Sequence, residues 1–314
     1  MIRVEEVKFM TIIDFLMDSD PAVKRMTKLY LLGEQNSYTV DGWIGDFLSN
    51  YDVEKNTWGN GIYSPKWTST FYTLRDLKSL EIDPMHQIYQ QGLKTLISHM
   101  WNPDKFVEDD ICVVAMLVSL LTYGQCSEAI INEMVQSLLS LQMPDGGWNC
   151  AVIYSHSTKS SIHTTLSVLE AYADYQKEGY SKEIPAIKEQ ELKGQDYLLR
   201  RKLMYRESTN EIILPSIVQF HFPTRWKYDV LRVLSYFAGI RYPYEPSLED
   251  GLNILKKKIE RGYLTKGTTY PGKIHFTLNN TKIGAMNTLR GLFILKYYDV
   301  DFYYEIISKE IHLS

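Results

Sequence analysis

Four basic residues lie at similar distances ahead of four leucine-rich segments. They are Lys66, Lys159, Arg225 and Lys282, which stand six to eight residues before Leu74, Leu166, Leu231 and Leu289 respectively. A cation near the start of a helix is repelled by the positive end of the helix dipole. The recurrence of a cation before all four segments therefore needs an explanation other than helix stability. One reason is a bound anion, because helix N-termini and basic side chains together hold phosphate or diphosphate. The alternative is a coincidence among solvated loop charges.

Aromatic side chains and one histidine accompany these cations. Trp67 and Trp226 each directly follow such a cation, and His163 lies just before Leu166. Aromatic residues gathered in loops are typical of the mouth of a ligand cavity. They could instead plug the end of the fold, and His163 could be a hydrogen-bonded core residue. The residues that we predict to bind a ligand are Lys66, Trp67, Trp148, Lys159, His163, Arg225, Trp226, Tyr228 and Lys282.

Three aspartates are the candidates for acid–base catalysis. Asp229 is the best-placed isolated carboxylate, although it could simply pair with Arg225 or Arg232. Asp109 and Asp110 precede another helical segment, where acidic residues also cap backbone N–H groups. No second acidic cluster with metal-ligand spacing accompanies this pair, so we expect neither a metal nor another cofactor.

The segments that must position these residues repeat along the chain. Five of them carry apolar residues at every third position, which places the side chains on one stripe of a helix. They are Leu74-Leu77-Leu80, Leu166-Leu169-Tyr172, Leu231-Leu234-Phe237, Leu289-Leu292-Leu295 and a looser copy, Val114-Leu117-Leu120. In three of the copies an arginine follows the first leucine: Arg75, Arg232 and Arg290. The repetition predicts five equivalent buried helices.

Other helical patterns alternate with these copies. They cover 85–101, 129–142, 187–202 and 248–259, and a further helix is expected to begin at Asp20-Pro21 and run through Met26, Leu29 and Leu32. Repeated helical hairpins must stack, either in an open solenoid or in a closed ring. Long loops before the four clear copies favour the ring: 51–66, 143–160, 203–225 and 260–281. We therefore predict one all-α domain over residues 1–314, an α/α toroid (barrel) of repeated helical hairpins with long loops at one rim.

One loop carries a recognisable motif. In the segment Gln142-Met143-Pro144-Asp145-Gly146-Gly147-Trp148, Gln142, Gly146 and Trp148 match the glutamine-tryptophan repeat of squalene-hopene cyclase-like proteins. In that repeat the glutamine caps backbone groups at a helix end and the indole stacks over the turn, which fastens one hairpin to the next. With its alternating helices, the chain resembles the α/α toroids of terpenoid cyclases and protein prenyltransferases. The resemblance implies an isoprenoid substrate and cyclase-like or transferase-like chemistry.

Two further patterns of these families are incomplete. Class II terpene cyclases protonate an alkene with an Asp-x-Asp-Asp motif, and Val107 stands in place of the first aspartate before Asp109 and Asp110. Protein prenyltransferases bind zinc through Asp, Cys and His, but Trp148 stands where the aspartate would precede Cys150. The three cysteines also lack a Cys-x-x-Cys pair, so we expect neither zinc nor a disulfide framework. Whether the protein is an enzyme stays open.

Composition narrows the range of partners. Lys and Arg total 34 against 38 for Asp and Glu, a formal net charge of −4 without a basic block, which argues against nucleic acid. No apolar run approaches the ~20 residues that span a bilayer, and the first residues lack a signal-peptide core. We expect a cytoplasmic protein without a transmembrane segment, and leave peripheral contact with a membrane open.

Three kinds of function fit these observations. In the first, the ring binds a mainly apolar isoprenoid ligand whose diphosphate head lies among the cations. In the second, the aromatic rim stacks on sugar rings, and Asp109, Asp110, Asp145 or Asp229 supplies the carboxylate pair of a glycosidase or lyase. In the third, the toroid binds a ligand or protein without catalysis. A deep aromatic cavity would favour the first, and a wet groove with two facing carboxylates the second.

Overall fold

The fold is mostly helical, as the sequence predicts. The computed structural model describes residues 8–35, 37–101, 110–150, 157–267, 270–279 and 281–313. Within these ranges, no helix combines the length and the apolar character needed to cross a bilayer. The buried apolar residues, from Ile12 to Ile311, form one continuous cluster.

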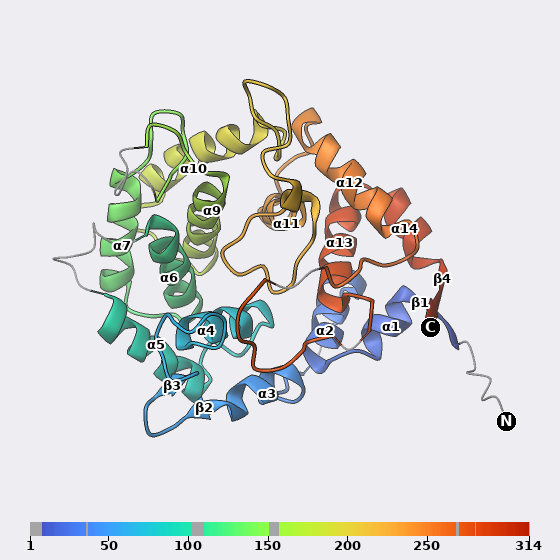
Figure 1. Ribbon diagram of the computed structural model, residues 1–314, viewed down its shortest axis with the longest axis horizontal. Coiled ribbons are helices and arrows are strands. Elements are labelled where there is room, and N and C mark those ends of the chain that lie inside the picture. Colours follow the sequence, from blue (N-terminus) through green and yellow to red (C-terminus); the bar gives the residue numbers. More distant parts are fainter. Residues whose placement is uncertain are drawn as a thin grey trace.

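Five helices stand around the centre of the molecule (Figure 1). These inner helices are α4 (Thr70–Ser79), α6 (Ile111–Tyr123), α9 (Ile162–Lys177), α11 (Val230–Gly239) and α13 (Ala285–Tyr298). Each carries one of the five apolar copies, and every apolar residue of those copies is buried. The spacing of three therefore correctly predicts both the helices and their buried stripes.

A second set of helices packs outside the first (Figure 1). These outer helices are α5 (Gln87–Met100), α7 (Glu128–Ser140), α10 (Ile184–Leu199), α12 (Glu249–Ile259) and α14 (Val300–Ile307), and the short 3-10 helix η4 (Pro246–Leu248) leads into α12. Each packs on the inner helix that precedes it in the chain. The first four coincide with the predicted spacer helices. The helix α14 was not predicted from the sequence. It begins at Asp299, whose side chain accepts the N–H of Phe302.

The N-terminal helix departs from its prediction. It begins as expected, because the Asp20 side chain accepts the N–H of Ala22 at 2.9 Å at the start of α2 (Pro21–Met26). It then continues as a π-helix, η1 (Thr27–Leu32), whose wider turn changes which residues share a face. The chain is therefore helical through Leu32 as predicted, but its second half is a π-helix, and Leu29 and Leu32 are exposed.

The N-terminal helices join the last inner helix to the first. Arg25 of α2 donates to two backbone carbonyls at the end of α4, each at 2.8 Å. Lys296 of α13 donates to two backbone carbonyls of η1, at 3.1 and 2.8 Å. The helix α3 (Trp43–Ser49) packs against both α2 and α4. The N-terminal helices therefore contact both α13 and the end of α4.

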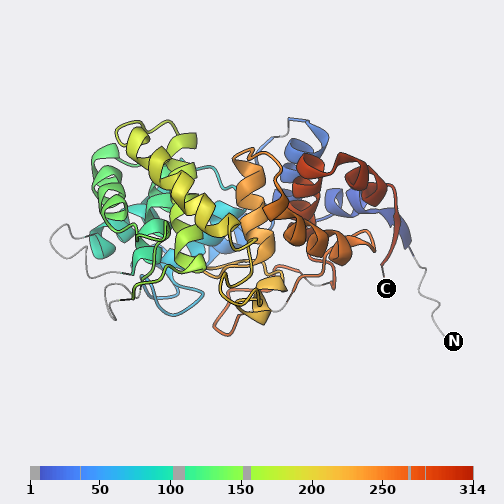
Figure 2. The same cartoon turned by 90° about the horizontal axis from the view of Figure 1, so that it is seen from above.

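Short strands complete the described structure. β1 (Lys8–Thr11), which leads into α1 (Ile12–Met17), pairs antiparallel with β4 (Glu310–Leu313), so the first and last described segments lie together. The hairpin of β2 (Tyr51–Asp52) and β3 (Thr57–Trp58) lies in the loop before α4. Figure 2 shows the segments that lead into α4, α11 and α13 along one side of the molecule. The N-termini of these inner helices therefore open toward the same side.

The glutamine-tryptophan segment fastens one hairpin to the next. The indole N–H of Trp148 donates to the carbonyl of Leu138 at 2.8 Å, and its backbone N–H donates to the Thr165 hydroxyl at 3.0 Å. The amide of Gln142 donates to the carbonyl of Gln190 in α10 at 2.9 Å. The segment thus ties α7, α9 and α10 together.

Trp58 repeats this arrangement in the preceding hairpin. Its indole N–H donates to a carbonyl of α3 at 2.7 Å, and its backbone N–H donates to the Thr70 hydroxyl of α4 at 3.1 Å. Each indole also lies against a glycine of an outer helix. A Cβ added at Gly92 would come 2.8 Å from the Trp58 ring, and one at Gly194 would come 2.9 Å from the Trp148 ring. The glycines make room for the two rings.

Candidate functional site

Charged side chains from the inner helices meet at the centre of the molecule. Arg232 of α11 donates through Nε and one NH2 group to the two carboxylate oxygens of Glu170 of α9, at 2.8 and 2.5 Å. The Arg232 side chain is only 3% exposed, so this is a buried bidentate ion pair. Burial acts to raise the pKa of Glu170, but Arg232 outweighs it and holds that pKa below its usual value.

The three arginines of the leucine copies belong to this central layer. Arg75 and Arg290 come from α4 and α13, and their charges act on the same groups as Arg232. From the sequence, these arginines were evidence only that the leucine segments repeat, and none of the three was predicted as a site residue. The recurrence of an arginine directly after the first leucine of three copies could have indicated that these arginines lie close together.

Several charges of this layer form ion pairs, but within the described ranges Arg75 and Arg290 do not, and a buried NH2 group of Arg290 has no hydrogen-bond partner. Arg225 forms an ion pair with Asp76, and Lys78 forms one with Asp174. Arg75 donates through one NH2 group to the carbonyl of Arg225 at 3.2 Å, and its buried Nε has no hydrogen-bond partner. Within the described ranges Arg75 also lacks an ion-pair partner. A positive charge and a buried donor therefore stay available at the centre.

A turn before α11 lies over the charged layer. Figure 1 shows the segment that leads into α11 crossing in front of the inner helices. Two guanidinium groups bind the backbone of this turn. Arg75 donates to the carbonyl of Arg225, and Arg232 donates to that of Lys227 at 2.8 Å. The Lys227 ammonium lies 4.4 Å from the centre of the Trp226 ring and 5.4 Å from that of Tyr270. The described part of the chain supplies Lys227 with no carboxylate at ion-pair distance.

His163 completes this group. Its Nδ1 accepts the backbone N–H of Tyr228 at 2.9 Å, and its ring meets the Trp226 ring edge to face with centroids 5.6 Å apart. Burial, with Arg232 and Lys227 nearby, lowers the pKa of His163 to about 4, so the ring is neutral at pH 7. Because Nδ1 accepts a hydrogen bond, the proton of the neutral ring is on Nε2.

We call Arg75, His163, Trp226, Lys227 and Tyr270 the central site. Each of the five residues keeps some exposed surface rather than being fully buried. The site combines two cations without ion-pair partners, two aromatic faces and a neutral histidine. Such a set can hold an anionic group beside an apolar or planar group.

The four cations predicted from their register do not act as one set. Arg225 is 8% exposed and its charge is neutralised by Asp76, whose pKa burial raises to about 6 despite that pairing. The side chains of Lys66, Lys159 and Lys282 are exposed. Only Arg225 among the four reaches the buried centre, and the central site uses the neighbouring Lys227 instead.

Three of the predicted aromatic residues support the structure around the site. Trp148 has no exposed surface and serves as the fastening described above. Trp67 is 5% exposed, and its indole N–H donates to the carbonyl of Pro271 at 3.0 Å while the Arg225 guanidinium lies over its ring. Tyr228 is 2% exposed and donates its hydroxyl to the carbonyl of Leu203 at 2.6 Å. Trp226 alone among the four predicted tryptophan and tyrosine positions is partly exposed.

Two of the predicted catalytic aspartates, Asp110 and Asp229, lie at helix starts. Asp229 is completely buried and accepts the N–H of Arg232 at 2.8 Å as the N-cap of α11, and burial raises its pKa against the nearby charge of Arg290. Asp110 is at the N-cap position of α6, but its side chain makes no capping hydrogen bond. Asp109 lies outside the described residues. The Asp145 carboxylate accepts the backbone N–H of Ser160 at 2.9 Å.

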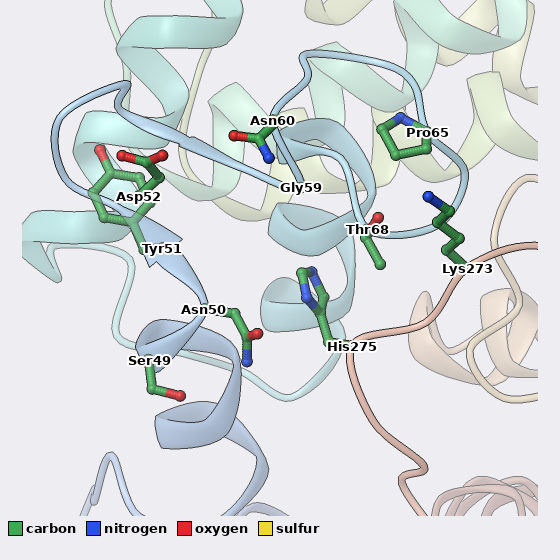
Figure 3. Close-up of a pocket in the computed structure, with 10 residues that line it drawn as sticks. All are labelled: Ser49, Asn50, Tyr51, Asp52, Gly59, Asn60, Pro65, Thr68, Lys273 and His275. Carbon is green, nitrogen blue, oxygen red and sulfur yellow. The ribbon is translucent and has the colours of Figure 1, made fainter.

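A separate pocket of about 500 Å³ lies near the β2–β3 hairpin. Figure 3 shows it between the hairpin, the loop before α4 and the segment that carries Lys273 and His275. Two of its polar side chains already have partners, since Asn50 donates to a carbonyl of α3 at 2.7 Å and Asn60 accepts from Lys55 at 2.8 Å. It includes none of the predicted residues, and we assign no function to it. No group of three or more His, Cys, Asp or Glu within the described ranges could hold a metal ion.

The pKa of His163 predicts a dependence of stability on pH. The folded state holds this group near pKa 4 and the unfolded state near 6.5, so below pH 6.5 the unfolded chain binds more protons. Stability is therefore lost as the pH falls. Between pH 7 and pH 4, we expect the wild type to lose about 1–3 kcal/mol relative to His163→Gln, measured by urea denaturation. An equal loss in both proteins would contradict the burial of a neutral His163.

Comparison with protein-family models, with curated proteins and with solved structures gave no match to this chain. The geometry of the central site is therefore the basis for any functional assignment.

Proposed function

We propose that the chain is a single α/α toroid whose central site binds a small molecule with an anionic head and an apolar body. Three features support the toroid: the alternation of inner and outer helices, the bridge from α13 to α4, and the pairing of β1 with β4. An isoprenoid diphosphate is the first ligand class to test, because the glutamine-tryptophan segment resembles that of terpenoid cyclases.

One observation carries the binding proposal. The Lys227 ammonium lies over the rings of both Trp226 and Tyr270, and it has no ion-pair partner within the described ranges. A cation held partly out of water attracts an anion more strongly than a solvated lysine does. The inner-helix N-termini on the same side add favourable partial charges for that anion. Trp226 and Tyr270 supply surface for the apolar part of the ligand.

The proposal stops at binding. Asp229 caps α11 and is completely buried, so it is poorly placed to exchange protons with a ligand. The carbohydrate-active alternative would need two facing carboxylates, and Asp145 and Asp229 are each engaged by backbone N–H groups. No observation favours it over binding, and it enters the experiment below as a comparison ligand.

Isothermal titration calorimetry with matched ligands tests the proposal. We expect farnesyl diphosphate to bind more tightly than farnesol, which has the same chain without the charge. Lys227→Gln should weaken farnesyl diphosphate binding about 10- to 100-fold, because one charge-assisted hydrogen bond contributes about 1.5–3 kcal/mol. Lys159→Gln, at an exposed predicted cation, is the matched control and should leave the affinity unchanged. Equal effects of the two substitutions, or binding of an oligosaccharide such as maltohexaose alone, would contradict the proposal.

A further inference from the structure

Two cysteines from different parts of the chain lie side by side at the start of α6. The backbone N–H of Cys112 donates to the Sγ of Cys150 at 3.2 Å, which brings the two residues into direct contact. The Thr164 hydroxyl lies 3.5 Å from the same Sγ. Both cysteines are partly exposed, and neither is in a disulfide.

These contacts favour a thiolate on Cys150. The Cys112 thiol, the Thr164 hydroxyl and the Cys112 N–H all act on its sulfur, and together they lower the pKa of Cys150 to about 7, although burial and Asp110 oppose them. The neighbouring Cys150 sulfur, with burial and Asp110, raises the pKa of Cys112 well above its usual value. The positive end of the α6 dipole acts in the same direction on Cys150. The pair therefore has one thiol prepared for attack and one that stays protonated until it is needed.

We propose that Cys150 and Cys112 form a thiol–disulfide exchange site for low-molecular-weight disulfides. The Cys150 thiolate attacks one sulfur of the disulfide, forms a mixed disulfide and expels the other half as a thiolate. That thiolate takes the proton of Cys112, whose sulfur then attacks Cys150 and releases the second half, which leaves as a thiol on protonation. Two protein thiols are oxidised to a disulfide, and the small disulfide is reduced to two thiols.

The third cysteine of the chain supplies an internal control. Cys126 is also partly exposed, but burial raises its pKa to about 11 and no second cysteine contacts it. The exchange site is independent of the proposed ligand site, because it uses none of the five central-site residues. A failure of ligand binding therefore leaves this inference intact, and the converse also holds.

Treatment of the reduced full-length protein with glutathione disulfide tests the proposal. We expect the intact mass to fall by two hydrogen atoms and peptide mapping to find Cys112 linked to Cys150. In Cys112→Ser the resolving thiol is absent, so the mixed disulfide with glutathione should accumulate on Cys150. Cys126→Ser should behave as the wild type. Accumulation of the mixed disulfide on Cys126, or an unchanged product in Cys150→Ser, would overturn the proposal.

Alkylation by iodoacetamide at pH 8 checks the reactivity without a redox step. A larger thiolate fraction, offset by the lower nucleophilicity of a more acidic thiol, should make Cys150 react at least about tenfold faster than Cys126. Thr164→Val removes one hydrogen bond to the sulfur while keeping the size of the side chain, and should slow Cys150 but not Cys126. Equal rates at the two cysteines in the wild type would overturn the inference even if the exchange variants failed to fold.

Discussion

Replacing Arg232 by methionine is expected to lower the free energy of unfolding by about 3–5 kcal/mol. The Arg232 side chain is 3% exposed and donates to both carboxylate oxygens of Glu170. Its loss leaves a largely buried carboxylate without its partner and removes the donor that holds the carbonyl of Lys227. Urea denaturation followed by circular dichroism measures the effect as a change in midpoint at constant slope.

A second substitution separates pairing from packing. Arg232→Met with Glu170→Met removes both charges, so the double variant should recover a large part of the lost stability. Lys193→Met is the surface control, because Lys193 and Glu189 form an exposed pair one helical turn apart, and it should change stability by less than about 0.5 kcal/mol. A loss below about 1 kcal/mol in Arg232→Met, or no recovery in the double variant, would contradict the buried ion pair.

Replacing Trp148 by alanine should have an effect of similar size, a loss of about 3–5 kcal/mol. The indole has no exposed surface, fills the space beside Gly194 and donates its N–H to the carbonyl of Leu138. Truncation leaves a cavity between α7, α9 and α10 and an unpaired carbonyl. The same denaturation measurement applies.

Substitution of Gly194 gives a sharper test, because Gly194→Ala should destabilise the wild type and stabilise the Trp148→Ala variant. In the wild type, Gly194→Ala brings a methyl group 2.9 Å from the Trp148 ring and 3.0 Å from Leu169, which should destabilise by about 1–3 kcal/mol. In Trp148→Ala the clash with the ring is gone and Leu169 can move into the space that the ring leaves, so the better helix propensity of alanine should stabilise by up to about 1 kcal/mol. Gly239 has nothing within 4 Å of an added Cβ and is the control that should not depend on Trp148. The same cost of Gly194→Ala in both backgrounds would show that the ring and the glycine are not coupled.

Much of the fold could be predicted from the sequence because its repeats are local. A spacing of three marks one stripe of a helix whatever the helix packs against, so the five inner helices and four outer helices were found from their own residues. The turn from α2 into the π-helix η1 was not, because Met26, Leu29 and Leu32 match an ordinary helical pattern. Met26 is buried and the two leucines are exposed, and nothing in the spacing of the three residues gives the position where the wider turn begins.

The site was harder to predict because its partners are distant in the chain. Glu170 and Arg232 meet from different helices, and the sequence offers no reason to pair them in particular. Lys227 lies in the sequence between Trp226 and Tyr228, which were both predicted to bind a ligand. The distance to the following leucine segment favoured Arg225 as the cation instead. Arg225 is neutralised by Asp76, more than a hundred residues away, and only the packed structure shows this.

His163 shows why two readings of one residue need not exclude each other. The sequence left it as either a ligand-binding residue or a hydrogen-bonded core residue. Its Nδ1 accepts a backbone hydrogen bond, as a core histidine would, while its ring stays partly exposed beside Trp226. The hydrogen bond fixes the ring orientation, so the residue can contribute to a site without being free to move.

The location of a bound anionic head group tests the central site most directly. A crystal structure of the protein grown with farnesyl diphosphate should show the diphosphate within hydrogen-bond distance of the Lys227 ammonium and on the side of the Arg75 guanidinium, with the farnesyl chain against Trp226 and Tyr270. A diphosphate bound instead at the exposed Lys66, Lys159 or Lys282, with the central site unchanged, would contradict the proposed function.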